Sequence, residues 1–291
     1  MNLSVVIPCR NAAHTIGDTL EALARQSWPA AWEVLVADNG SDDHLQTVLE
    51  EYRGRMPALR CLDASATRGP SHARNCGVRM ATGDGILFCD ADDIPAPGWA
   101  RAMAEGLHTH AFVACRLEFD ALNAPALRVA RDNTQVRDLQ RFNFLPFAHA
   151  GAGTLGIVKT LHEKIGGFDE TLPICEDIDY CMRVQQTGVR LQLVPDARLS
   201  CRLRQRPTGI FLQAAHYAEY EVYLYKKYTT PPMYEWWRWR QYGRAWRFLL
   251  SRVPRLLGTR EGQTLLAWRL GRQLGLLKGS LRFGTSPVTI E

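Results

Sequence analysis

Three carboxylates fall within the four residues Asp90-Ala91-Asp92-Asp93. They follow the apolar run 86–89, which predicts a buried strand. Like charges at a strand end repel one another unless a cation lies among them. Mg²⁺ is commonly held by one or two carboxylates together with substrate phosphates. The segment therefore predicts a site for a divalent cation and a diphosphate, and a ligand-free turn rich in Asp is the alternative.

A second acidic cluster, Glu176-Asp177-Ile178-Asp179, begins a predicted helix. Carboxylates crowded at this point are candidates for a catalytic role. The helix macrodipole also stabilises acidic residues in a first turn for structural reasons. From these residues both interpretations stay open.

Polar loops follow three other predicted strands, at residues 8–11, 38–43 and 68–77. In open parallel sheets, ligands bind beyond the carboxyl ends of the strands, so we expect these loops to line one crevice with Asp90. Asp38 can accept a hydrogen bond from a base, and Arg74 can reach a phosphate. Asp42 as a helix cap and Arg74 as the partner of a carboxylate are the structural alternatives. The residues expected to contact a nucleotide are Pro8, Arg10, Asp38, Asn39, Arg68, Arg74, Asp90 and Ala91.

The elements that must position these loops alternate between strand and helix. Strands are predicted at 3–8, 33–38, 59–63, 85–90, 153–159 and 190–195, and helices at 14–26, 42–53, 70–81 and 176–187. Such alternation predicts an α/β fold with a mostly parallel sheet and helices on both faces. Residues 121–150 are irregular and are expected to form a loop-rich edge.

Length and composition favour one large domain with an appendage, because 291 residues with 46% hydrophobic content can bury a full α/β core. We expect a domain at 1–205 and a helical region at 206–291. No basic segment of the signal-peptide type precedes the first strand, and no apolar run reaches the roughly 18 residues of a membrane span. The eight cysteines show no paired spacing. Free thiols in a reducing cytoplasm are therefore expected.

Charge is distributed unevenly along the chain. Residues 1–201 hold 19 Lys/Arg and 25 Asp/Glu, a net charge of −6, whereas residues 202–291 hold 16 and 5, a net charge of +11. This asymmetry indicates an anionic partner for the C-terminal region.

Aromatic and basic residues interleave within that region. The aromatics are Tyr234, Trp236, Trp237, Trp239, Tyr242, Trp246 and Phe248, and the basic residues are Arg238, Arg240, Arg244 and Arg247. The mixture suits an anionic membrane surface, and a helical cap packed on the sheet domain is the alternative. Nucleic acid also binds such residues, but no nucleic-acid partner is expected. Further on, Gly271, Gly275 and Gly279 form a stripe that permits close helix approach or consists of tolerated surface positions.

The order of six motifs resembles family 2 of the glycosyltransferases, whose fold is called GT-A. The motifs are V-I-P-x-R-N, A-D-N-G-S-D-D, A-R-N-x-G, A-x-G-D-x-I-x-F-x-D-A-D-D, G-G-F-D-E and E-D-x-D. The resemblance spans about residues 3–200. The resemblance implies that Asp38 contacts the nucleotide base and that Asp90 and Asp92 contact the ribose, the diphosphate and a Mg²⁺ or Mn²⁺ ion. It also implies that Asp177 is the catalytic base, with Glu176 beside it.

Two departures from the family pattern bear on the substrate. Many relatives read D-D-G-S where this chain has Asp38-Asn39-Gly40-Ser41, which leaves both UDP and dTDP donors open. Many also carry a His after the last sheet strand, where this chain has Cys201-Arg202-Leu203-Arg204. Either Arg202 or Arg204 is expected to replace that His near the diphosphate, and the alternative is that both merely begin the basic tail.

The resemblance and the site together imply an inverting, metal-dependent glycosyltransferase. It would move a sugar from a nucleoside-diphosphate sugar to a glycan or lipid-linked acceptor in bacterial surface polysaccharide or glycolipid synthesis. We expect it in the cytoplasm, peripheral to the inner face of the membrane. A nucleotidyltransferase is an alternative, although residues 8–11 lack the glycine-rich loop expected for it. A non-catalytic nucleotide-sugar-binding protein is another.

Overall fold

The computed structural model describes residues 1–56, 58–129, 134–229 and 235–288. Tyr234, one of the interleaved aromatics, lies outside the described residues. The chain divides into two compact units. The first comprises Met1–Glu118, Thr134–Gln140 and Ala148–Arg202, and the second comprises Phe119–Asn133, Arg141–Phe147 and Leu203–Glu291.

The first unit is built on an eight-stranded sheet in the order β3-β2-β1-β4-β7-β6-β8-β5. Its strands are β1 (Leu3–Cys9), β2 (Trp32–Asp38), β3 (Leu59–Asp63), β4 (Gly85–Phe88), β5 (Ile94–Pro95), β6 (Phe112–Glu118), β7 (Leu155–Val158) and β8 (Gln192–Ser200). Its helices are α1 (Ala13–Ala24), α2 (Leu45–Tyr52), α3 (Pro70–Met80), α4 (Trp99–Thr109), α6 (Lys159–Lys164) and α7 (Glu176–Gln186), with short 3-10 turns η1 (Thr134–Val136) and η2 (Ala152–Thr154).

The sheet is mixed. The β3-β2-β1-β4 half is parallel, β7 runs antiparallel to both β4 and β6, β6 pairs parallel with β8, and β5 pairs antiparallel with β8. Val5, Val6 and Ile7 of β1 have no exposed surface, so both faces of the central strand are covered. The α/β fold expected from the sequence is confirmed, with a larger antiparallel share than alternation alone suggested.

Several predicted boundaries differ from the observed ones for physical reasons. β4 ends at Phe88 because the chain turns at Asp90, whose carbonyl accepts a hydrogen bond from the Asp93 N–H at 3.2 Å. β8 continues past Pro195 to Ser200. Its pairing with β6 shifts register between Cys115 and Arg116, and the shift accommodates a proline that has no N–H to donate. Helix α4 and strand β6 were not among the elements expected.

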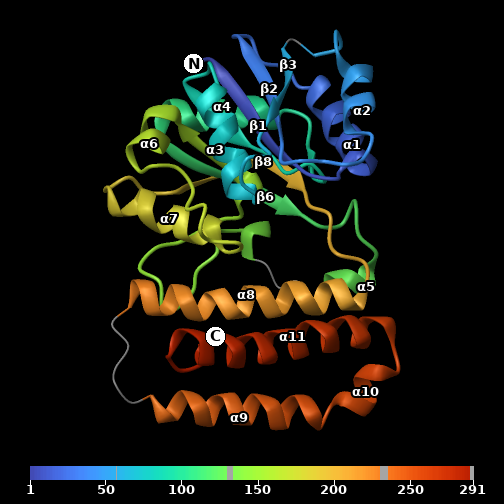
Figure 1. Cartoon of the computed structure of the whole chain (residues 1–291), viewed down its shortest axis with the longest axis vertical. Helices are drawn as coiled ribbons and strands as arrows, with labels where there is room; N and C mark the ends of the chain where they lie inside the picture. Colours follow the sequence, from blue (N-terminus) through green and yellow to red (C-terminus); the bar gives the residue numbers. More distant parts are fainter. Residues whose placement is uncertain (57, 130–133, 230–234, 289–291) are drawn as a thin grey trace. The chain divides into compact units, whose positions relative to one another are not determined.

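The second unit is helical, with α5 (Pro125–Arg128), α8 (Pro207–Tyr228), α9 (Trp236–Leu250), α10 (Val253–Leu257) and α11 (Arg260–Phe283). Within this unit α11 lies between α8 and α9 (Figure 1). No helix among the described residues is both long enough and apolar enough to cross a bilayer.

The glycine stripe of α11 faces α8. A Cβ added to Gly271 would lie 2.3 Å from the carbonyl oxygen of Phe211, and one added to Gly275 would lie 2.1 Å from that of Ala215. A Cβ on Gly279 would lie 2.6 Å from the Glu219 carbonyl oxygen. Of the two alternatives predicted for the stripe, the structure shows the first: the glycines permit close approach of α8 and α11. They are not tolerated surface positions.

Candidate active site

The loops after β1 and β2 are joined by hydrogen bonds between backbone and side chain. The N–H of Asn11 donates to Ser41 Oγ at 3.0 Å, and the N–H of Asp42 donates to Asn11 Oδ1 at 3.0 Å. Asp42 does not cap α2, whose first flanking residue is His44. The carboxylate of Asp43 instead accepts the N–H of Ala13 at 2.8 Å, at the start of α1. The two loops thus form one connected edge beyond the parallel strands.

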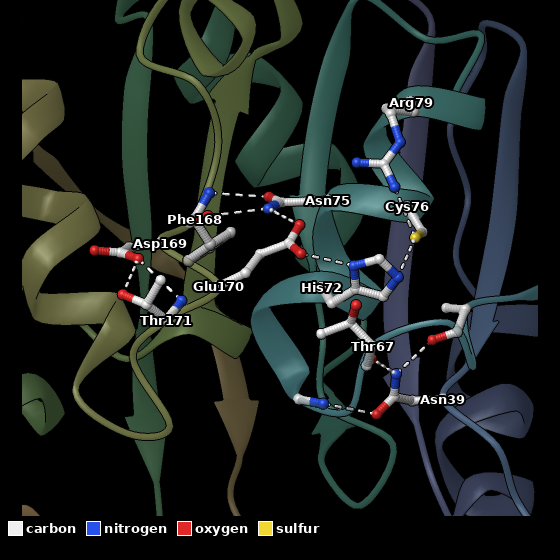
Figure 2. Close-up of polar contacts among 12 residues, drawn as sticks. Asn39, Thr67, His72, Asn75, Cys76, Arg79, Phe168, Asp169, Glu170 and Thr171 are labelled. Carbon is white, nitrogen blue, oxygen red and sulfur yellow. Dashed lines mark hydrogen bonds and ion pairs between the residues drawn. The ribbon is translucent and has the colours of Figure 1, made fainter.

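Asn39 ties the end of β2 to the loop before α3 (Figure 2). Its amide nitrogen donates to the carbonyl oxygens of Ala64 and Thr67, and its amide oxygen accepts the N–H of Gly69 at 2.8 Å. With 5% of its surface exposed, Asn39 is committed to these backbone contacts. An Asp at this position could not donate to two carbonyls, which gives the departure from D-D-G-S a structural reason.

Asp38 precedes Asn39 and keeps part of its carboxylate accessible. Its Oδ1 accepts the N–H of Ser41 at 2.9 Å, which orients the side chain at the strand end. The remaining oxygen is an acceptor of the kind that a base N–H requires.

Arg74 connects two distant acidic groups. Its guanidinium donates to Asp90 Oδ1 at 2.7 Å and to Glu176 Oε1 at 2.8 Å. The side chain is 4% exposed, and Phe168 lies beneath it at 5.5 Å from the ring centroid. Burial opposes the charged form, but the two carboxylates outweigh burial and raise the pKa of Arg74. The structural alternative for Arg74, pairing with carboxylates, is therefore observed, while its expected phosphate contact stays a prediction.

Asp177 lies next to Glu176 at the start of α7. Burial, reinforced by the charge of Glu176, raises its pKa from 3.8 to about 7, against the opposing effect of the Ile178 N–H, which donates to Oδ1 at 2.8 Å. A Cβ built on Gly151 would lie 4.0 Å from Asp177 Oδ2, so the segment before η2 passes beside this carboxyl group. A carboxylate with such a pKa is a stronger base than an ordinary aspartate.

The Asp90–Asp93 segment has the donor set that a hard divalent cation prefers. Burial raises the pKa of Asp93 well above its ordinary value, and the negative charges of Asp90 and Asp92 add to this effect. Asp90 keeps 37% of its side chain exposed. Among the described residues, no three His, Cys, Asp or Glu side chains converge to hold a metal ion by themselves. Two carboxylates therefore fit Mg²⁺ or Mn²⁺ when substrate phosphates complete the coordination.

Arg202 and Arg204, which sequence reasoning could not separate, lie in different units. The N–H of Arg202 donates to Asp93 Oδ1 at 3.1 Å, and its Nε donates to the Asp92 carbonyl at 3.3 Å. Its guanidinium also pairs with Asp18 Oδ2 of α1 at 3.1 Å. Arg204 instead lines a small pocket of the second unit with Ile210 and Trp268. Arg202 therefore lies beside the acidic segment, and a diphosphate contact stays a prediction for both arginines.

The G-G-F-D-E motif packs against α3 (Figure 2). Asn75 donates to the Phe168 carbonyl at 3.0 Å and to Glu170 Oε1 at 2.8 Å, and its amide oxygen accepts the Phe168 N–H at 2.9 Å. His72 Nδ1 lies 2.7 Å from Glu170 Oε2. A Cβ on Gly167 would lie 2.5 Å from Asn75 Oδ1, and the φ of Gly167 is +73°, so this position requires glycine. The motif thus positions the segment that leads to α7.

The remaining predicted nucleotide contacts differ in how far they are exposed. Arg10 and Arg68 are exposed, Pro8 is half-buried, and Ala91 is buried.

Two residues that were not predicted also shape the site. Asp18 holds Arg202, and a Cβ on Gly153 would lie 2.8 Å from the carboxyl carbon of Asp90. A glycine next to a strand start signals close backbone approach and could have indicated Gly153, whereas nothing in the local sequence marks Asp18.

Comparison with known proteins identifies the family. The model of glycosyl transferase family 2 matches residues 4–153. The glycosyltransferase AglE of Haloferax volcanii is 34% identical over 221 residues, covering 72% of this chain and 69% of that protein. The pre-mycofactocin glycosyltransferase of Mycobacterium tuberculosis is 27% identical over 209 residues, covering 67% of this chain, and the chain spans 42% of that relative's length.

Solved structures share the fold. A mannosyltransferase from Pyrobaculum calidifontis, in complex with GDP-Man and Mn²⁺, aligns with a TM-score of 0.70 at 20% identity, over 95% of this chain and 86% of that one. Residues 1–349 of TarS from S. aureus, in complex with UDP, align with a TM-score of 0.57 at 17% identity, over 98% of this chain and 92% of that one. These alignments support the GT-A type fold inferred from the motifs. The chain belongs to glycosyl transferase family 2.

Proposed function

We propose that this chain is an inverting, metal-dependent glycosyltransferase. It takes a sugar from a nucleoside-diphosphate donor of the UDP or dTDP type and transfers it to a hydroxyl group of a glycan or lipid-linked acceptor. The setting we propose is bacterial surface polysaccharide or glycolipid synthesis, with the enzyme attached peripherally to the cytoplasmic face of the membrane.

The observation that carries the proposal is the bridge that Arg74 makes between Asp90 and Glu176. Asp90 begins the segment whose carboxylates suit a metal and a diphosphate, and Glu176 adjoins Asp177, the carboxyl group with the raised pKa. The bridge therefore holds the proposed donor end of the site close to the start of α7, which carries the proposed base, and proximity of this kind favours group transfer.

The chemistry follows from these residues. Asp92 and Asp90 would hold Mg²⁺ or Mn²⁺, which supplies positive charge for the departing diphosphate. The acceptor oxygen forms a bond to the sugar C1 while the bond from C1 to the diphosphate oxygen breaks, and the diphosphate takes the electron pair. Asp177 receives the hydroxyl proton. Attack from the face opposite the leaving group inverts the anomeric centre.

Arg202 has a separate proposed task. Its backbone and guanidinium already contact Asp93, Asp92 and Asp18. A guanidinium there can donate to a phosphate oxygen, so we propose Arg202 in place of the His common among relatives. Arg204 is not assigned to the diphosphate.

The test compares Asp177→Asn with Asp196→Asn, which makes the same change at an exposed carboxylate. Asp177→Asn should lower kcat by at least on the order of 10²-fold, because it keeps the shape and removes the base. Nucleotide affinity, measured by thermal shift with and without Mn²⁺, should barely change in either variant. Unchanged kcat in Asp177→Asn would move the role to Glu176 or Asp179.

Turnover and thermal-shift measurements also separate the alternative functions. A nucleotidyltransferase would release pyrophosphate from a nucleoside triphosphate, so its signature is turnover with triphosphates and not with diphosphate sugars. A non-catalytic nucleotide-sugar-binding protein would show the thermal shift without sugar transfer to any acceptor tried. Either result would overturn the transferase proposal.

A further inference from the structure

Helix α9 turns an aromatic and basic face away from its own unit. Trp236, Trp237 and Phe248 are 63%, 43% and 48% exposed. At 100° per residue they share one side of the helix with Arg240, Arg244 and Arg247, which are also exposed. We call these six residues the outer face of α9.

The opposite side of α9 accounts for its attachment to the unit. The hydroxyl of Tyr242 donates to the Gln273 carbonyl of α11 at 2.8 Å, and Leu249 is 2% exposed. Trp246 packs on the cluster that contains Tyr225 and Leu276. Because this inner side already anchors the helix, the aromatic rings of the outer face are not needed for the core.

The charged residues of α9 and α10 are all arginines. Residues 236–260 contain seven arginines and no Asp or Glu, and one of the seven, Arg238, pairs with the buried Glu235 at 2.8 Å. Between α8 and α11, by contrast, the buried carboxylates Glu219 and Glu221 pair with Arg272, Lys278 and Arg282 at 2.8 Å. The excess positive charge of the second unit therefore concentrates on α9 and α10.

The arginines and aromatic rings of this segment contact one another. The guanidinium carbon of Arg240 lies 5.3 Å from the centre of the Trp236 ring, and that of Arg252 lies 3.9 Å from the centre of the Phe248 ring. Indole rings partition to the boundary between headgroups and acyl chains, and arginine donates to lipid phosphates at the same depth. A single helix face also offers no groove along which a nucleic-acid strand could run.

We propose that the outer face of α9 docks on the anionic headgroup layer of a lipid bilayer. The Trp and Phe rings enter the interface, and Arg240, Arg244 and Arg247 bind lipid phosphates. This docking refines the peripheral attachment in the proposed function, but it does not require that sugar transfer occur.

The experiment is flotation of the whole chain with vesicles of phosphatidylcholine, with or without phosphatidylglycerol. The chain should float with the anionic vesicles at low salt and bind less as salt screens the charges. The triple variant R240Q/R244Q/R247Q should bind on the order of 10²-fold more weakly, since each arginine near an anionic surface strengthens binding about fivefold. W236A/W237A/F248A should bind weakly at any salt concentration.

The matched control is R25Q/R53Q/R101Q, which removes three exposed arginines from the first unit and should float like the wild type. The docking would be overturned if the wild type failed to float at low salt. It would also be overturned if the two α9 variants floated as well as the wild type. Binding of single-stranded RNA in place of vesicles would assign the face to nucleic acid instead. Nucleotide-dependent thermal shift is measured on the same samples, so loss of donor binding would count against the proposed function and not against the docking.

Discussion

In the first unit, five carboxyl groups lie on the segments that contact two arginines, whereas in the second two buried glutamates pair with three basic side chains. The carboxyl groups are those of Asp90, Asp92, Asp93, Glu176 and Asp177, beside Arg74 and Arg202. The second set is Glu219 and Glu221 with Arg272, Lys278 and Arg282. Each unit thus contains an ionic network. Acidic groups are in excess in the network of the first unit, and basic groups are in excess in that of the second.

The difference shows what a charge imbalance can indicate. An acidic excess that is partly buried lacks enough cations of its own, so it favours binding a metal ion and the phosphates that accompany it. A basic network that is internally paired, next to a segment with arginines and no acids, favours an anionic surface. Four predictions test this comparison, in order of decreasing effect.

Asp92→Ala should give the largest effect, because it removes a carboxylate expected to hold the metal without removing a backbone contact to Arg202. We expect turnover to fall by at least on the order of 10³-fold, with little change in melting temperature. Isothermal titration with Mn²⁺ and nucleotide measures the loss of metal binding. Asp84→Ala, at an exposed position, is the control. If Asp92→Ala turned over at the wild-type rate in the absence of a divalent metal, the acidic segment would have no role in metal-assisted transfer.

Gly275→Ala tests the second unit. The new Cβ would lie 2.1 Å from the Ala215 carbonyl oxygen, so α8 and α11 must separate, at a cost of about 1–3 kcal/mol in unfolding free energy. The control is Gly243→Ala in α9, where a Cβ meets nothing within 4 Å. That control should be neutral or stabilise by up to about 1 kcal/mol. Denaturant unfolding measures both, and equal stability of the two variants would contradict the close packing.

The pH dependence of kcat/KM, which reports the free enzyme, should follow the carboxyl group of Asp177. Its pKa of about 7 means that the base is mostly protonated at pH 6 and mostly ionised at pH 8. Because a general base must be ionised, kcat/KM should rise about tenfold over this interval and then level off. Asp177→Asn should lose this rise. A wild-type profile that is flat between pH 6 and 8 would remove Asp177 from the rate-limiting proton transfer.

Asn39→Asp should give the smallest effect. It replaces a double donor by a carboxylate, which leaves the carbonyl oxygens of Ala64 and Thr67 without their amide partner. We expect a loss of about 1 kcal/mol in stability and a weaker nucleotide-induced thermal shift, because the loop before α3 is released. Asn2→Asp adds the same charge at an exposed position and serves as the control. Equal melting temperatures would mean that the loop is held by other contacts.

The local sequence pattern was sufficient to predict the strands of the parallel half of the sheet and the position of the acidic segment at a strand end. The apolar runs of β1, β2 and β4 specify buried strands wherever they occur, and the carboxylates that follow them must lie at strand ends. The family motifs also marked Asp177 as the candidate base, and that role stays a prediction. Pattern was less informative at β8, because Pro195 suggested a strand end and the register shift that accommodates it depends on pairing with β6.

The residues themselves determined which chemical groups are available: crowded carboxylates in one part of the chain, arginines among aromatics in another, and a glycine stripe C-terminal to both. Tertiary structure decided their partners. Arg74 could have bound a phosphate or a carboxylate, and it pairs with Asp90 and Glu176, the latter 102 positions away, because β4 and α7 approach α3. Tertiary structure likewise decided which groups contact Asn39, Arg202 and Gly275. Each depends on which backbone comes within about 3 Å, and that distance is set by packing between elements far apart in the chain.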